Sequence, residues 1–203
     1  MDNTVKAFFK WKNDKNRKTV EENNKNNSIV SKWDKLDVLY SFIGIYTIGI
    51  YVFYPKLCNR TDYQIRRGEN KKAFFSSNYL SNNYMNYPEL NKVIEESGFI
   101  NVYDTLGNVI PIWPGGNEDR GTRAQCFDIP EIYFCKKHPR WFKNLCNEYP
   151  EAKLQLIEDD MFILDTKEFL DNMNKDTYKK YLKHIVEVIQ KRTEIIRGGK
   201  NEI

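Results

Sequence analysis

Apolar residues recur at three- and four-residue spacing near the end of the 203-residue chain. This spacing places them on one face of an α-helix that Asp176 can cap and that Gly198 and Gly199 can end. The apolar face consists of Tyr178, Tyr181, Leu182, Ile185, Val188, Ile189, Ile195 and Ile196. The opposite face is basic and consists of Lys179, Lys180, Lys183, His184, Lys191, Arg192 and Arg197. The pattern predicts a long amphipathic C-terminal helix.

Two shorter helices are predicted elsewhere. Residues 88–97 begin with Pro88, which suits a first helical turn, and are followed by Gly98 at the stop position. Leu90, Val93 and Ile94 share one face of this helix. Residues 4–12 are also expected to be helical, whereas the polar stretch 13–27 has almost no apolar residue to bury and predicts a mobile segment.

Residues 38–55 contain no charged side chain. Ser28 can cap a helix over 29–43, with Gly44 as its stop, and 45–54 then has the β-branched and aromatic composition of a strand. The segment is about as long as a short membrane span, which remains an alternative. A buried helix followed by a buried strand accounts better for its polar residues, so we expect core.

A hairpin is predicted over 99–113. Two β-rich runs, 99–104 and 108–113, flank a turn at Thr105, Leu106 and Gly107 that Asp104 opens. Gly107 is expected at a positive-φ bulge, with Asn108 beginning the return strand. Together these elements predict a mobile polar segment 1–27 and a single α+β domain 28–203, with a small antiparallel sheet or hairpins flanked by several helices.

Composition places the chain among folded intracellular proteins. It is 40% apolar and 30% charged, with a formal net charge of +4 and a pI near 8.7, so a nucleic-acid partner is permitted and not required. The four cysteines are too few and too irregularly spaced for a disulfide framework, and the first 35 residues lack an apolar leader. We therefore expect a cytoplasmic protein with reduced thiols.

Standard catalytic signatures are missing from the sequence, including phosphate-binding glycine loops, the nucleophile elbow and the paired-histidine zinc motif. The densest polar region is the predicted hairpin and the glycine-rich loop after it. Candidate catalytic residues there, with Mg²⁺ as a cofactor that carboxylates could hold, are Asp104, Asn108, Arg120 and Asp128. Candidate binding residues are Thr105, Arg120, Arg123, Lys183, Lys191 and Arg192.

A zinc site is a weaker candidate. Three thiolates and one imidazole could bind Zn²⁺ tetrahedrally, and the residues concerned are Cys126, Cys135, His138 and Cys146. Only Cys135 and His138 are closely spaced, whereas structural zinc sites usually consist of two close pairs. Buried cysteines that pack as small apolar residues are the favoured interpretation.

The run from Tyr103 to Trp113, with Arg120-Gly121 after it, resembles an uncharacterised bacterial family. That family has a T-[IL]-G-N-x-I-P core, an Arg-Gly loop and a closing helix with an I-x-x-R pattern, matched here by Ile189 to Arg192. The same pattern is distantly similar to the tail of HNH-type nucleases of modification-dependent restriction systems. Their metal-binding and general-base histidines have no counterpart, since no histidine precedes His138.

These observations favour a non-enzymatic binding or interaction module of a phage-defence or mobile-element system that contacts nucleic acid or a protein partner, and no membrane. The alternative is a metal-dependent hydrolase or nuclease that uses the polar residues at 104–128. The sequence leaves open whether the protein is an enzyme, what its substrate or partner is, and its oligomeric state.

Overall fold

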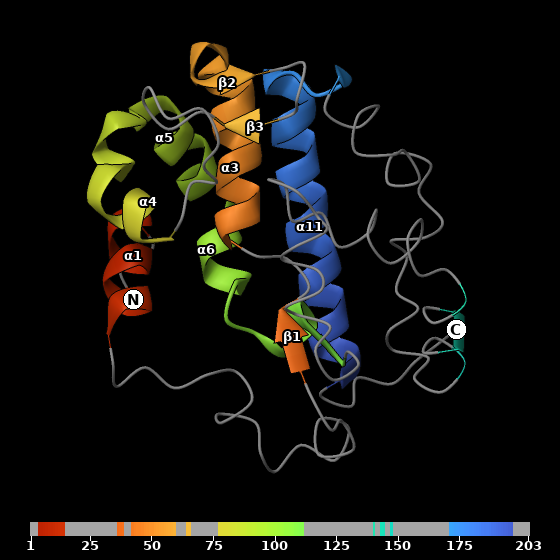
Figure 1. Cartoon of the computed structure of the whole chain (residues 1–203). Coiled ribbons are helices and arrows are strands. Elements are labelled where there is room, and N and C mark those ends of the chain that lie inside the picture. The colour runs from red at the N-terminus through yellow and green to blue at the C-terminus, as the bar shows by residue number, and fades with distance from the viewer. Residues whose placement is uncertain are drawn as a thin grey trace.

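The computed structural model describes residues 4–14, 36–38, 42–59, 64–65, 77–111, 140, 143–144, 147 and 171–196. Helices form most of this part of the chain, and the two longest, α3 and α11, lie side by side at its centre (Figure 1). The helices are α1 (Val5–Asn13), α3 (Phe42–Phe53), α4 (Ser77–Asn83), α5 (Pro88–Ser97), α6 (Phe99–Val102) and α11 (Lys175–Ile196), with 3-10 turns η2 (Pro55–Leu57), η3 (Tyr84–Asn86) and η4 (Leu106–Asn108).

Strands within the described residues are confined to two short antiparallel pairs. β1 (Leu36–Val38) pairs with β4 (Val109–Pro111), and β2 (Cys58–Asn59) pairs with β3 (Gln64–Ile65). Neither pair provides a sheet on which helices could form a layer. The expected α+β fold is therefore wrong, and the described core is helical. The error arose because apolar runs rich in β-branched and aromatic residues were interpreted as strands.

Helix α3 occupies the uncharged segment. All of its residues except Ile43 are buried, so the expectation of a core segment is confirmed between Phe42 and Phe53. The expected strand at 45–54 is wrong, as is a stop at Gly44, which lies inside the helix. A helix surrounded by protein has no polar face, so its sequence lacks the 3.6-residue alternation that would identify it. The residues 36–38, expected to be helical, form β1.

No helix in the described ranges is long and apolar enough to cross a membrane.

Within the core, α3 packs against α5 and α11. The Tyr178 hydroxyl of α11 donates a hydrogen bond of 2.9 Å to the Ile45 carbonyl of α3. A Cβ atom at Gly49 would overlap the Leu90 side chain and lie 2.7 Å from the Tyr178 hydroxyl oxygen, so glycine allows these three helices to approach closely.

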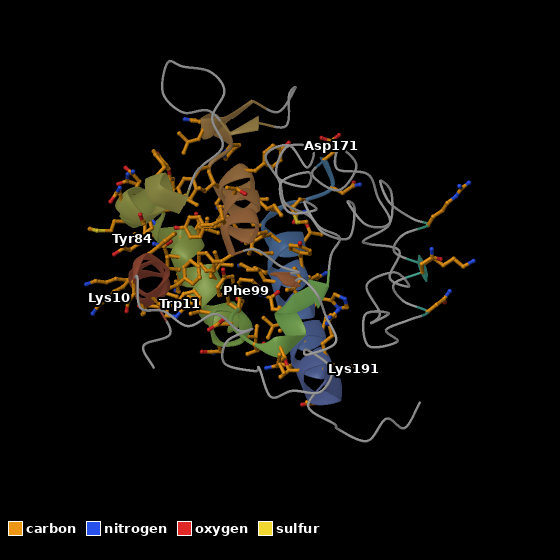
Figure 2. The ribbon with its side chains drawn as sticks, turned by 60° about the horizontal axis from the view of Figure 1, so that its bottom comes forward. Lys10, Trp11, Tyr84, Phe99, Asp171 and Lys191 are labelled. Carbon is orange, nitrogen blue, oxygen red and sulfur yellow. The ribbon has the colours of Figure 1, made fainter. Side chains whose placement is uncertain are left out.

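Helix α1 confirms the helix expected near the N-terminus. Thr4 caps it by accepting a hydrogen bond from the Ala7 amide, and Val5, Phe8 and Phe9 are buried. The Phe8 ring stacks on Phe42 with 3.6 Å between centroids, in an aromatic cluster around which Figure 2 labels Trp11, Tyr84 and Phe99. Residues 5–13 of the segment expected to be mobile are therefore helical, and the buried side of this helix is part of the core. Residues 15–27 lie outside the described ranges.

Helix α5 confirms the helix expected after Pro88. Pro88 is its first residue, and Gly98 follows its end in the left-handed conformation with φ 76°. Leu90, Val93 and Ile94 are buried, as their spacing predicts. The N-cap is Tyr87, whose side chain makes no capping hydrogen bond. Proline at the first position suits this end of the helix because it has no amide hydrogen to satisfy.

Helix α11 confirms the long C-terminal helix and its apolar stripe from Tyr178 to Ile189. Tyr178, Tyr181, Leu182, Ile185 and Ile189 are each 0% exposed. Its cap differs from the expectation at Asp176. The side-chain oxygen of Asn174 accepts hydrogen bonds of 2.9 Å and 3.0 Å from the amides of Asp176 and Thr177. The glycines at 198–199 lie outside the described residues.

The hairpin expected at 99–113 is wrong, although a strand does form at Val109–Pro111, within the expected return strand 108–113. Phe99 and Val102 lie on the buried side of α6, and Leu106–Asn108 form the 3-10 turn η4. The strand that follows, β4, pairs with the distant β1 instead of returning along 99–104. Gly107 is not at a positive φ, because Gly98 is the only such glycine in the described chain. Phe99 and Val102 are three residues apart, so a helical turn buries both of them on one side.

Candidate functional site

The motif Thr105-Leu106-Gly107-Asn108 packs against the C-terminal half of α11. The Gly107 amide donates a 3.0 Å hydrogen bond to the hydroxyl oxygen of Thr193, and that hydroxyl donates to the Ile189 carbonyl at 2.8 Å. The Thr105 hydroxyl oxygen lies 3.3 Å from that of Thr193 and donates to the Val102 carbonyl. The structure thus brings the Thr105–Asn108 turn against Ile189 and Thr193, although they are more than 80 residues apart in the sequence.

Glycine is required at position 107 because η4 and α11 approach each other closely there. A Cβ atom at this position would overlap the carbonyl oxygen of Ile189 and lie 2.6 Å from the hydroxyl and 2.8 Å from the amide nitrogen of Thr193. The obstacle is mostly helix backbone, which cannot move aside as a flexible side chain would. Gly107 therefore sets the distance between η4 and α11.

Asn108 closes the same turn. Its side chain is 0% exposed, and its amide nitrogen donates a 2.7 Å hydrogen bond to the Tyr103 carbonyl. Its backbone amide donates to the Thr105 carbonyl at 3.0 Å. These hydrogen bonds satisfy polar groups that would be costly to bury unpaired. Asn108 therefore stabilises the turn, whereas Asp104, just before the turn, is exposed.

The other candidate catalytic residues, Arg120 and Asp128, lie outside the described ranges, as do Arg123 and the four zinc candidates Cys126, Cys135, His138 and Cys146. The described residues contain no group of three or more His, Cys, Asp or Glu side chains that could hold a metal ion. The hydrolase hypothesis therefore stays a prediction that depends on Arg120 and Asp128.

Arg192 differs from the other basic residues of α11. It is 0% exposed and is among the largest fully buried side chains, whereas Lys183 and Lys191 are exposed. The helical repeat explains the difference, because Arg192 follows Ile185 and Ile189 by seven and three positions and shares their buried face. Arg192 therefore belongs to the interior and not to the basic surface predicted from the sequence.

Two buried tyrosines, Tyr46 and Tyr178, were not predicted from the sequence to have a special role. Tyr46 donates a hydrogen bond to the side-chain oxygen of Asn91, and Tyr178 donates to the Ile45 carbonyl. Burial raises the pKa of both phenols well above the ordinary value of 10. They stay protonated near neutral pH and act as hydrogen-bond donors between helices, so neither is a general base.

The exposed face of α11 carries several lysines. Lys179, Lys180 and Lys183 are exposed and neighbour one another at one-, three- and four-residue spacing, and Lys191 follows about two turns later. Lys183 lies 4.0 Å from Glu187, with both side chains mostly in solvent, which makes this a weak pair. We call Lys179, Lys180, Lys183 and Lys191 the α11 lysine face.

Lys175 is on the same helix but has other partners. Its ammonium nitrogen lies 2.6 Å from Glu89 and 5.0 Å from the centroid of the Phe53 ring. It ties α11 to α5 and α3 and is therefore not counted in the lysine face. Glu187 and Glu194 are exposed among or beyond these lysines, which limits the positive potential of the helix at its C-terminal end.

No protein-family model, no curated protein and no solved structure matches this chain.

Proposed function

We propose that this protein is a cytoplasmic nucleic-acid-binding module of a phage-defence or mobile-element system, and that the α11 lysine face makes the contact. The observation that carries the proposal is the exposure of four lysines along one well-packed helix. Ammonium groups held on a rigid element can neutralise phosphates and release their counterions, which is the main source of affinity in non-specific binding.

The packing of α11 supports this use of its exposed face. Its apolar stripe is buried against α3, α5 and α6, and its C-terminal half is held by η4. The helix is therefore fixed in position, so its exposed lysines keep a constant spacing. A net charge of +4 for the whole chain favours association with a polyanion.

The test is binding to a labelled nucleic acid at low salt, comparing the natural protein with Lys179→Gln/Lys180→Gln/Lys183→Gln. The matched control is Lys6→Gln/Lys10→Gln/Lys92→Gln, which removes the same charge from exposed positions on α1 and α5. Figure 2 shows Lys10 at the left, well apart from Lys191 near the lower end of α11. Substitutions at exposed lysines should change stability by less than about 0.5 kcal/mol, which thermal unfolding can verify.

We expect the α11 variant to bind at least about tenfold more weakly, since three ammonium groups no longer neutralise phosphates, and the control to weaken much less. Equal weakening in the two variants would show that net charge alone matters and would contradict the assignment of the face. Absence of binding by the natural protein at low salt would exclude nucleic acid as the ligand. The protein would then be expected to bind a protein partner instead.

A further inference from the structure

We infer that the α11 lysine face contacts the phosphate backbone of a duplex and does not read base edges or stack on bases; this rests on the proposed function. The inference comes from which side chains the exposed face offers. The described exposed residues of α11 are Lys175, Asp176, Lys179, Lys180, Lys183, Glu187, Gln190, Lys191 and Glu194.

Base stacking needs an exposed aromatic side chain or a guanidinium plane. None of these exposed α11 residues is aromatic or arginine. The two tyrosines of the helix, Tyr178 and Tyr181, are 0% exposed, as is Arg192, and the imidazole-bearing His184 is only partly exposed. A single strand could therefore contact the lysines of this face, but its unstacked bases would have no exposed tyrosine or arginine of α11 to stack on.

Base edges are read by side chains that make paired hydrogen bonds, chiefly arginine, asparagine and glutamine, and lysine can also pair with guanine. Apart from the lysines, Gln190 is the one residue of this kind in the described exposed face, and it lies next to Lys191 and between Glu187 and Glu194. Lysine acts on phosphate as a compact, strongly hydrated point charge and lacks the rigid fork of arginine. The chemistry of the face therefore suits binding to the backbone.

The spacing of the lysines also suits a regular backbone. Lys179 and Lys191 are twelve residues apart, about 18 Å along the helix axis at roughly 1.5 Å per residue. A straight helix of that length meets only some of the phosphates that one strand passes, because the strand winds around the duplex axis. The lysine face is long enough to reach more than one phosphate, with Lys179, Lys180 and Lys183 at one end and Lys191 at the other.

The experiment measures affinity as a function of salt concentration for two duplexes of equal length and unrelated sequence, and for one single strand. We expect the natural protein to bind both duplexes within about threefold and the single strand more weakly, since the backbone carries the binding. In Lys179→Gln/Lys180→Gln/Lys183→Gln, the slope of log K against log salt should become shallower by about 0.9 for each phosphate that is no longer neutralised.

That variant should weaken binding to both duplexes by the same factor, which is the signature of binding through phosphates. Weakening that is more than about tenfold larger for one duplex, or tighter binding of the single strand, would overturn the inference while leaving the proposed function intact. An unchanged salt slope in the variant would also overturn it. Absence of binding to all three probes would instead reject the proposed function.

Discussion

At the scale of single residues, Gly107 is the position where the structure limits substitution most clearly. Its backbone amide and the Thr193 hydroxyl join η4 to α11, and a methyl group has no space against the Ile189 carbonyl. The sequence pattern indicated a special glycine at 107 because of a bulge that does not exist. Gly107 is still important, but the reason is that the backbones of η4 and α11 approach closely there.

We therefore predict that Gly107→Ala lowers the free energy of unfolding by about 1 to 3 kcal/mol, as expected when a group is inserted into a filled interior. Urea denaturation followed by circular dichroism measures this change. The control is Glu194→Ala, an exposed neighbour of Thr193, which should stay within about 0.5 kcal/mol. A Gly107→Ala protein as stable as the natural one would show that η4 can separate from α11 without cost.

At the scale of elements, α1 shows how a short helix is held by tertiary packing. Nine residues are too few for a stable isolated helix. Its buried face supplies Val5, Phe8 and Phe9, and the amide of Val5 donates to the Glu95 side chain at 3.0 Å. The aromatic cluster formed with Phe42, Tyr84 and Tyr103 therefore fixes α1 on its neighbours in the core.

Phe8→Ala should accordingly destabilise the protein by about 3 to 5 kcal/mol, the usual range for removing a buried phenylalanine side chain. Lys10→Ala, on the exposed side of the same helix, should have an effect below about 0.5 kcal/mol. Thermal or chemical denaturation distinguishes the two. If both variants unfold like the natural protein, α1 does not contribute to the cooperative core.

Sequence patterns predicted α5 and α11 because each has a polar face, and because Pro88 and Gly98 mark the ends of α5. The patterns failed at α3, which is buried almost throughout and so carries no periodicity. They also failed at 99–108, where residues with strand propensity form α6 and η4, whereas the strand expected after the turn exists as β4. Long-range packing decided these segments, and it is not encoded in local spacing.

The candidate site was predictable only in part. Exposure of Lys183 and Lys191 followed from the amphipathic pattern, whereas burial of Arg192 depended on the orientation of α11 against its neighbours. The partnership between Gly107 and Thr193 spans 86 positions, and no local rule joins them.

At the scale of the whole molecule, the core is held together by tyrosine hydroxyls as well as by apolar packing. Tyr46 and Tyr178 are fully buried, and burial raises the pKa of each above the usual value of 10. In the unfolded chain these phenols release protons near pH 10, whereas in the folded protein they keep them. Above that pH the folded state binds more protons than the unfolded state, so stability must fall as pH rises.

We therefore predict that these two tyrosines contribute almost no change of stability between about pH 7 and 9. Above about pH 10 the free energy of unfolding should decrease by up to roughly 1.4 kcal/mol per pH unit for each phenol. Urea denaturation between about pH 8 and 11.5 tests this. Tyr46→Phe and Tyr178→Phe should each make the decline less steep, and a decline of equal slope in either variant would contradict the assigned cause.

The central claim is that α11 presents the surface that meets nucleic acid, and the most direct measurement is protection of lysines from an amine-reactive reagent, read residue by residue with mass spectrometry. With a duplex bound, the account predicts reduced labelling of the α11 lysine face and unchanged labelling of Lys6 and Lys10 on α1. Labelling of the α11 lysines that does not change on binding, or protection found on α1 instead, would contradict it.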